Sequence, residues 1–153
     1  MMQLKFNPPG YPVNVEVNYL CLYDEISDTS NLYASLIKLT SQQTGYTKYV
    51  IASTVWGSNK ERWTSLGLYT TRSSGTEDLG TGIIYVGNTN FPQGFYDVII
   101  YENSSNENLD PTGLNIVYRG LLNLYPATGN TEPVEYTEYT TNDSDTESVY
   151  ITN

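Results

Sequence analysis

The stretch VNVEVNYLCLY, residues 13–23, alternates apolar and polar side chains. Because successive side chains of a β-strand point to opposite faces, this period of two predicts a strand with one buried face. The polar face begins with Asn14, Glu16 and Asn18, so the apolar face is expected to be the buried one. The apolar face consists of Val13, Val15, Val17, Tyr19, Cys21 and Tyr23. On it, Cys21 is expected to pack as a small buried hydrophobe.

Working outward from this stretch, six more segments are rich in strand-forming residues and are separated by polar turns. Their ranges are 32–41, 46–53, 62–70, 79–87, 95–102 and 114–125. Within them, Trp63 is expected to anchor the core, and Gly45 marks a hairpin turn. In the last segment, one face is expected to hold Leu114, Ile116, Tyr118, Gly120, Leu122 and Leu124. Seven short strands with turns about every 8 to 12 residues predict a single all-β domain, a β-sandwich.

Three regions follow from the composition along the chain. Residues 1–12, MMQLKFNPPGYP, form an N-terminal extension with a short strand followed by a proline-rich linker. Residues 13–131 form the sandwich domain, and residues 132–153 form an extended acidic C-terminal arm. A chain of 153 residues is long enough for one domain with its own core.

The residue types exclude many functions. The chain has no histidine and one cysteine, so it has neither a Ser-His or Cys-His pair nor a cysteine-based zinc site. The net charge is −10, from 17 acids and 7 bases, which disfavours nucleic acid and anionic membranes as partners. No apolar run approaches the roughly 20 residues that a membrane span needs, and the N-terminus has no signal-peptide pattern.

Carboxylate catalysis remains conceivable, but no spacing singles out a pair of acids. The candidates are Asp24, Glu25, Glu61, Asp97 and Glu102. Asp97 lies in a strand that is apolar on both sides, which favours a hydrogen-bonded structural acid. We therefore predict no catalytic residue and no cofactor. The chain is expected not to be an enzyme.

The acids Asp143, Asp145 and Glu147 alternate as in the first half of a calcium-binding EF-hand loop. That loop needs glycine at its sixth position, where this chain has Ser148, and a glutamate at position twelve, which would lie beyond Asn153. The run is therefore interpreted as a solvated charged segment, and no metal site is predicted.

The arm, which ends EYTEYTTNDSDTESVYITN, carries six of the 17 acids and none of the bases. This composition predicts a solvated segment when the protein is free. It also carries aromatic and aliphatic residues that can pair as a strand on the sheet edge of another chain. The expected partner-binding residues are Tyr136, Tyr139, Val149, Tyr150 and Ile151.

The chain has 15 tyrosines and three phenylalanines, a balance typical of strands and interfaces. Trp56 precedes a polar loop and is expected to be exposed. An exposed tryptophan beside strand tyrosines leaves a second class open, a carbohydrate-binding β-sandwich module that stacks sugars on aromatic rings.

Several segments resemble small structural proteins of tailed bacteriophages. They are GFYDVIIYE at 94–102, NLDPTG at 108–113, VYRGLLNLY at 117–125 with the acidic arm after it, and NLYASLIKLTSQQTGYTKYVIA at 31–52. The resemblance implies an immunoglobulin-like β-sandwich and a non-enzymatic role as a capsid decoration or auxiliary head protein. The implied partners are the major capsid protein or other virion proteins, and copies of the chain itself.

The resemblance also implies a location in the virion, after synthesis in the cytoplasm of the bacterial host. It carries no active-site residues. An alternative within the same class is a tail or fibre component, as an adaptor or a receptor-binding module. A receptor-binding module would expose Trp56 and the loops at residues 71–79 and 103–113.

Overall fold

The structure is a computed structural model that describes residues 1–22, 25–27, 35–54, 64–127, 138–139 and 149–150. The fold is all-β, as predicted. A five-stranded sheet has the order β1 (Met2–Phe6), β9 (Ile116–Pro126), β8 (Gly94–Tyr101), β3 (Leu36–Ser41) and β4 (Thr47–Ile51). A four-stranded sheet holds β2 (Asn14–Leu20), β6 (Thr64–Thr71), β5 (Ser53–Thr54) and β7 (Ile83–Tyr85). The 3₁₀ helix η3 (Ser74–Thr76) is short, and no helix in the described ranges is long and apolar enough to cross a membrane.

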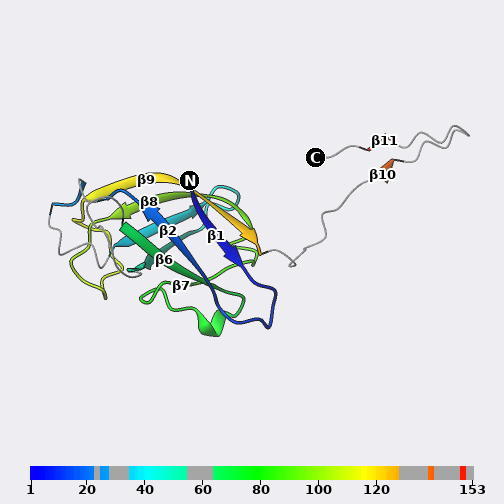
Figure 1. The fold of residues 1–153 in the computed structure, drawn as a ribbon, viewed down its shortest axis with the longest axis horizontal. Coiled ribbons are helices and arrows are strands. Elements are labelled where there is room, and N and C mark those ends of the chain that lie inside the picture. Colours follow the sequence, from blue (N-terminus) through cyan, green and yellow to red (C-terminus); the bar gives the residue numbers. More distant parts are fainter. Residues whose placement is uncertain (23–24, 28–34, 55–63, 128–137, 140–148, 151–153) are drawn as a thin grey trace, which may run out of the picture.

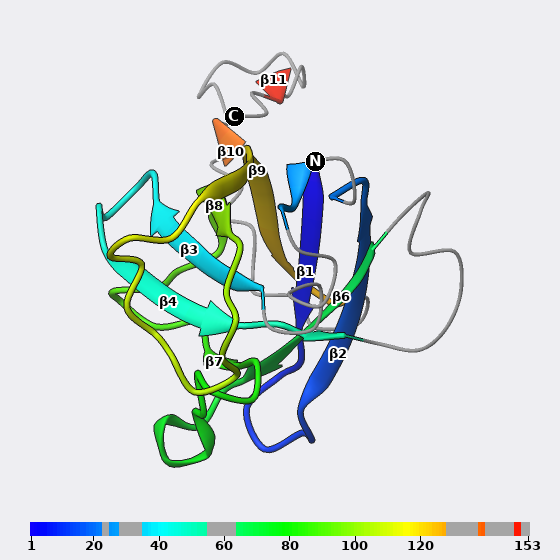
Figure 2. The ribbon, with the colours of Figure 1, turned by 90° about the vertical axis from the view of Figure 1, so that its left-hand side faces the viewer.

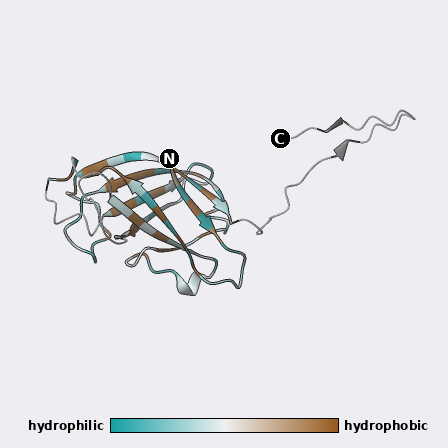
Figure 3. Cartoon of the chain, in the orientation of Figure 1, coloured by the Kyte–Doolittle hydropathy of each residue, from teal (hydrophilic) through white to brown (hydrophobic). Residues whose placement is uncertain are grey.

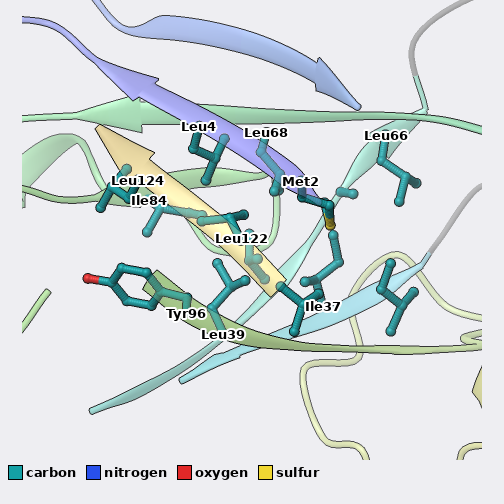
Figure 4. Packing of buried hydrophobic residues seen from close by; sticks show 14 of the residues in the cluster. Met2, Leu4, Ile37, Leu39, Leu66, Leu68, Ile84, Tyr96, Leu122 and Leu124 are labelled. Atoms are coloured by element: carbon teal, nitrogen blue, oxygen red, sulfur yellow. The ribbon is translucent and has the colours of Figure 1, made fainter. Parts of the chain in front are cut away.

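The two sheets enclose one hydrophobic core (Figures 2 and 4). Brown, apolar residues concentrate on the strands of the body in Figure 3. Tyr96 is the largest fully buried side chain, and its ring lies 4.4 Å from that of Phe91. Burying one large apolar side chain contributes about 1.5–3 kcal/mol, so a cluster drawn from both sheets holds them together. The labelled members in Figure 4 are Met2, Leu4, Ile37, Leu39, Leu66, Leu68, Ile84, Tyr96, Leu122 and Leu124.

The chain itself joins the two sheets on one side. β4 ends at Ile51, and β5 begins two residues later and pairs with β6 of the other sheet. Between them, the Ala52 N–H donates to the Ser35 carbonyl at 3.1 Å, which continues the pairing next to β3. Sequence reasoning placed residues 46–53 in one strand, and the structure divides this segment between two sheets.

β1 belongs to the body of the fold and not to a separate N-terminal extension. It pairs in parallel with β9, with Met2 opposite Leu122 and Leu4 opposite Leu124. Met2, Leu4 and Phe6 are fully buried, whereas Gln3 and Lys5 face outward. The prediction that residues 1–12 form a separate N-terminal extension is therefore corrected. Residues Met2–Phe6, which alternate buried and outward-facing side chains, form an edge strand that contributes to the core.

The prediction that the apolar face of β2 is buried was wrong. Val13, Val15, Tyr19 and Cys21 are exposed, whereas the polar face is half-buried and turned inward. The register with β6 shows why, because Glu16 lies opposite Leu68 and Asn18 opposite Leu66. Both leucines are fully buried, and cross-strand partners share a face of the sheet. Cys21 is thus an exposed thiol and not a core residue, and Tyr23 lies outside the described residues.

β9 confirms only part of its predicted buried face. Leu122 and Leu124 are buried, but Ile116 is exposed and Val117 is buried instead. The register between β8 and β9 shifts at Ile100 and Tyr101, so that Tyr118 faces Ile100 and Ile116 faces Tyr101. Such a bulge places one extra residue in a strand and reverses the faces beyond it. Period-two reasoning carried across it therefore assigns Ile116 to the wrong side.

Two short strands lie in the predicted arm (Figure 1). β10 (Glu138–Tyr139) and β11 (Val149–Tyr150) pair antiparallel with each other, with Tyr139 opposite Val149. They form their own two-stranded sheet and pair with no strand of the two larger sheets. Trp63, the predicted core anchor, lies outside the described residues.

Candidate binding surfaces

The polar face of β2 holds the edge of β1 that does not pair with β9. The Gln3 N–H donates to Asn18 Oδ1 at 2.9 Å, and Asn18 Nδ2 donates to the Gln3 carbonyl at 2.9 Å. The Lys5 carbonyl accepts from Asn14 Nδ2 at 3.0 Å and from Thr70 Oγ1 at 2.6 Å. Side chains of one sheet thus pair the edge of the other. This is the physical reason why the asparagines of β2 point inward.

The apolar side chains of β2 consequently lie on the outer surface of the four-stranded sheet. We call this surface the valine face and define it by Val13, Val15, Val17, Tyr19, Tyr69 and Ile83. Val15 stands beside Tyr69 of β6, which stands beside Ile83 of β7, so one apolar row crosses three strands. Val17 faces Gly67, which has no side chain to rise above the sheet.

Val13, Val15 and Tyr19 of the valine face are exposed, whereas its other three members, Val17, Tyr69 and Ile83, are half-buried, and none of the six is charged. Val15 is 47% exposed and Tyr19 is 66% exposed. Covering an exposed valine or tyrosine with a partner removes apolar area from water and costs no desolvation of charge. Contiguous exposed apolar patches on soluble proteins commonly mark interaction sites. The geometry is therefore suited to docking against another protein surface.

The outer surface of the five-stranded sheet has a different chemistry. One row of side chains crosses four strands, with Lys38 of β3 between Tyr49 and Ile99, and Arg119 of β9 on the other side of Ile99. We call Lys38 and Arg119 the cationic pair. No carboxylate within the described ranges lies at salt-bridge distance from either. The nearest acid along β8, Asp97, accepts a hydrogen bond from Gln42 Nε2 at 2.9 Å.

The other described lysines have carboxylate partners. Lys5 Nζ lies 3.8 Å from Glu16 Oε1, and Lys48 Nζ lies 2.5 Å from Glu77 Oε2. Lys48 also donates to the Tyr85 carbonyl at 3.0 Å, while the Tyr85 N–H donates to the same Glu77 oxygen. This half-buried cluster fastens the segment before β7 to β4. Its polar groups are engaged with one another, which is the behaviour of a structural site.

The candidate acids do not assemble into a paired site. Glu25 and Asp97 are exposed, whereas Glu102 is buried and accepts from the Ser27 N–H at 3.1 Å and from Ser27 Oγ at 2.9 Å. Asp24 and Glu61 lie outside the described residues. Within the described ranges, no three His, Cys, Asp or Glu side chains cluster as metal ligands would. The run Asp143, Asp145 and Glu147 also lies outside them.

The loop at residues 103–113 is organised by its own hydrogen bonds. Asn103 is fully buried, and its Nδ2 donates to the Asn108 carbonyl at 2.8 Å. The Thr112 hydroxyl and N–H both donate to Asp110 Oδ1, at 2.7 and 3.0 Å, and these bonds lower the pKa of the Asp110 carboxyl. In the loop at residues 71–79, η3 buries no side chain.

Several predicted binding residues can be placed only in part. Tyr139, Val149 and Tyr150 lie in β10 and β11, whereas Tyr136, Ile151 and Trp56 lie outside the described residues. Sequence reasoning missed Asn14, Asn18, Lys38 and Arg119. A signal was present for the first two, because asparagines on alternate sites of one strand face can pair an exposed backbone edge. No protein-family model, curated protein or solved structure matches this chain.

Proposed function

We propose that the protein is a non-enzymatic structural protein of a tailed-bacteriophage virion, a capsid decoration or auxiliary head protein that docks on the major capsid protein. The observation that carries the proposal is the outward direction of the valine face. Local sequence rules favour apolar side chains inside and polar ones outside, and departures from them concentrate at functional sites. β2 departs from this rule from Asn14 to Tyr19, whereas its last residue, Leu20, packs against the core.

A capsid that presents many identical docking sites suits an apolar face of this kind. Each contact through Val15 and Tyr19 is modest, but many copies on one particle add their contacts through multivalency. The protein would then reside in the virion, with copies of itself and other virion proteins as neighbours. We do not assign it a nucleic acid, a membrane or a cofactor.

The strand order supports the finer fold proposal, an immunoglobulin-like sandwich with an acidic arm. In immunoglobulin domains, strands B and E are neighbours in one sheet, and strands C, F and G are neighbours in the other. Here β2 neighbours β6, while β3, β8 and β9 are consecutive in the five-stranded sheet. The arm, residues 132–153, follows the last strand of this sandwich.

The test is cosedimentation of the purified full-length protein with capsids of the same phage that lack it. The wild-type protein should bind at a fixed ratio to the major capsid protein. The double variant Val15→Thr/Tyr19→Thr keeps β-forming residues but removes apolar area, and it should bind about tenfold more weakly or worse. The matched control is Tyr46→Thr/Leu109→Thr, which changes two exposed apolar residues away from the valine face.

Each outcome has a defined meaning. Equal binding by the wild type and the valine-face variant would remove this face as the dock. Absence of wild-type binding would refute the head assignment. In that case, purified tails and host glycans would be the next binding partners to assay, corresponding to a tail or fibre component and to a carbohydrate-binding module.

A further inference from the structure

The cationic pair lies on the five-stranded sheet, whereas the valine face lies on the four-stranded sheet. We propose that the outer surface of the five-stranded sheet binds the acidic arm, residues 132–153, of a second copy of this chain. The proposal joins two features: two cations on one sheet face that have no acidic partner among the residues the structure describes, and a segment that carries six acids and no base. Each feature supplies what the other lacks.

The cationic pair stands out against the charge of the rest of the chain. The net charge is −10, of which the arm contributes −6, so residues 1–131 carry 11 acids and 7 bases, or −4. An acidic segment is therefore repelled by the body in general. Lys38 and Arg119 offer it a local positive site, and Asp97 on β8 between their strands is engaged with Gln42.

Apolar side chains flank the cationic pair. Ile99 stands between Lys38 and Arg119, and Phe95 and Leu121 on the same face are 50% and 42% exposed. Cationic groups next to exposed apolar area suit a ligand that carries acidic groups and apolar side chains together. The arm carries both kinds of group, because its sequence contains acids together with tyrosine, valine and isoleucine residues. Contact with the arm would cover apolar area and neutralise charge at the same time.

The spacing of the acids also fits. Lys38 and Arg119 lie on β3 and β9, which are separated by one strand, so about 9 to 10 Å of sheet divides their backbones. Glu132 and Glu135, which precede β10, are three residues apart in the sequence. In a polyproline II conformation, residues three apart face the same side at about 9 Å. If this part of the arm of the second copy adopts that conformation, these two acids can reach the two cations together.

The arm of a second copy is the occupant that the topology favours. Ala127 is held at the end of β9, where its N–H donates to the Phe6 carbonyl at 2.9 Å, and the chain leaves the sheet there. Arg119 lies earlier on the same strand, so the protein's own arm would have to reverse direction to reach it. Strands β10 and β11 pair only with each other and not with the body strands of their own chain.

The test is the self-association of the full-length protein, measured by sedimentation equilibrium at low salt and at about 0.5 M salt, where charges are screened within a few ångström. Wild-type protein should associate at low salt and dissociate at high salt. Lys38→Gln/Arg119→Gln and Glu132→Gln/Glu135→Gln/Glu138→Gln should each weaken association tenfold or more. Lys60→Gln/Arg62→Gln is the control, because it removes the same charge at other positions of the sequence.

A charge exchange makes the assignment specific. Lys38→Glu/Arg119→Glu should abolish association, and adding Glu132→Lys/Glu135→Lys to the same chain should restore it. Unimpaired association of Lys38→Gln/Arg119→Gln would overturn the proposed face. A wild-type protein that is monomeric at every salt concentration would overturn the second copy as occupant. Neither result bears on capsid binding through the valine face, which the Val15→Thr/Tyr19→Thr variant measures separately.

Discussion

The Asn18 side chain pairs with the backbone of Gln3 as a neighbouring strand would, with one bond accepted and one donated, each 2.9 Å long. Edge strands present unpaired N–H and carbonyl groups that invite pairing with other chains. Here an amide side chain from the opposite sheet occupies these groups. The same contact closes the fold on the side opposite the crossover from β4 to β5 and commits β2 to an outward valine face.

Loss of this amide should measurably weaken the fold. Asn18→Ala removes two hydrogen bonds, each worth about 0.5–1.5 kcal/mol, so we expect a loss of about 1–2 kcal/mol, because water can replace part of the pairing. Urea denaturation of the full chain measures it. Asn123→Ala is the control: Asn123 lies on β9, and its side chain makes no hydrogen bond within the described residues. Equal losses in both variants would contradict the pairing role of Asn18.

Two glycines with the same φ should differ in their tolerance of a side chain. Gly45 and Gly87 both have a φ of 73°, which disfavours any residue with a Cβ atom. At Gly45 an added Cβ meets nothing within 4 Å, whereas at Gly87 it would lie 2.7 Å from Arg72 Nε.

We expect Gly45→Ala to cost about 1 kcal/mol from the backbone alone. Gly87→Ala should cost about 1 kcal/mol more, because the guanidinium of Arg72, which lies 5.1 Å from the Phe6 ring centre, must also shift to make room for the added Cβ. Thermal denaturation compares the two variants. Similar melting temperatures would show that Arg72 yields freely.

Stability should fall in alkali because of Tyr96. Burial raises the pKa of its hydroxyl to about 12, against a smaller opposite effect of Ser41, and the hydroxyl donates to the Pro92 carbonyl. Between pH 10 and 12 the unfolded chain loses this proton while the folded chain keeps it. The free energy of unfolding should therefore decrease by about 1.4 kcal/mol per pH unit across that window and be unaffected by Tyr96 below it.

The comparison for this prediction is Tyr96→Phe, which keeps the ring against Phe91 but removes the titrating group. The difference in unfolding free energy between wild type and variant should shrink above pH 10. A difference that stays constant up to pH 12 would show that the Tyr96 hydroxyl titrates normally in the folded protein.

The buried carboxylate of Glu102 should be a strong local anchor. It accepts two hydrogen bonds from Ser27, and bonds to charged groups contribute about 1.5–3 kcal/mol. Glu102→Ala removes the acceptor of both Ser27 hydrogen bonds and leaves a void where the buried side chain packed, so we expect a loss of about 2–3 kcal/mol in urea denaturation. Glu107→Ala, at an exposed site five residues later, should change the stability by less than about 0.5 kcal/mol. Comparable effects would exclude the anchoring role.

The strands themselves were predictable, because alternation and turn residues are local properties of the chain. Residues 13–23 and 32–41 contain β2 and β3, residues 95–102 match β8 to within one residue at each end, and the all-β class follows from this repeated pattern. The acidic arm, residues 132–153, was also recognisable from the sequence. Of the predicted binding residues, Trp56, Tyr136 and Ile151 lie outside the described residues. The cationic pair was not predictable, since Lys38 and Arg119 come into one row only through the pairing of β3, β8 and β9.

By itself, the sequence determined that a strand with two unlike faces lies within residues 13–23, where the structure has β2. Only the tertiary structure decided which face is inside. A period of two is the same whichever face is buried, and hydrophobicity alone favours the valines. The backbone edge of β1 requires hydrogen-bond partners, and Asn14 and Asn18 can provide them where valine cannot. The same logic explains β1, whose alternation predicted a short strand but whose place in the core depends on β9, more than 100 residues away.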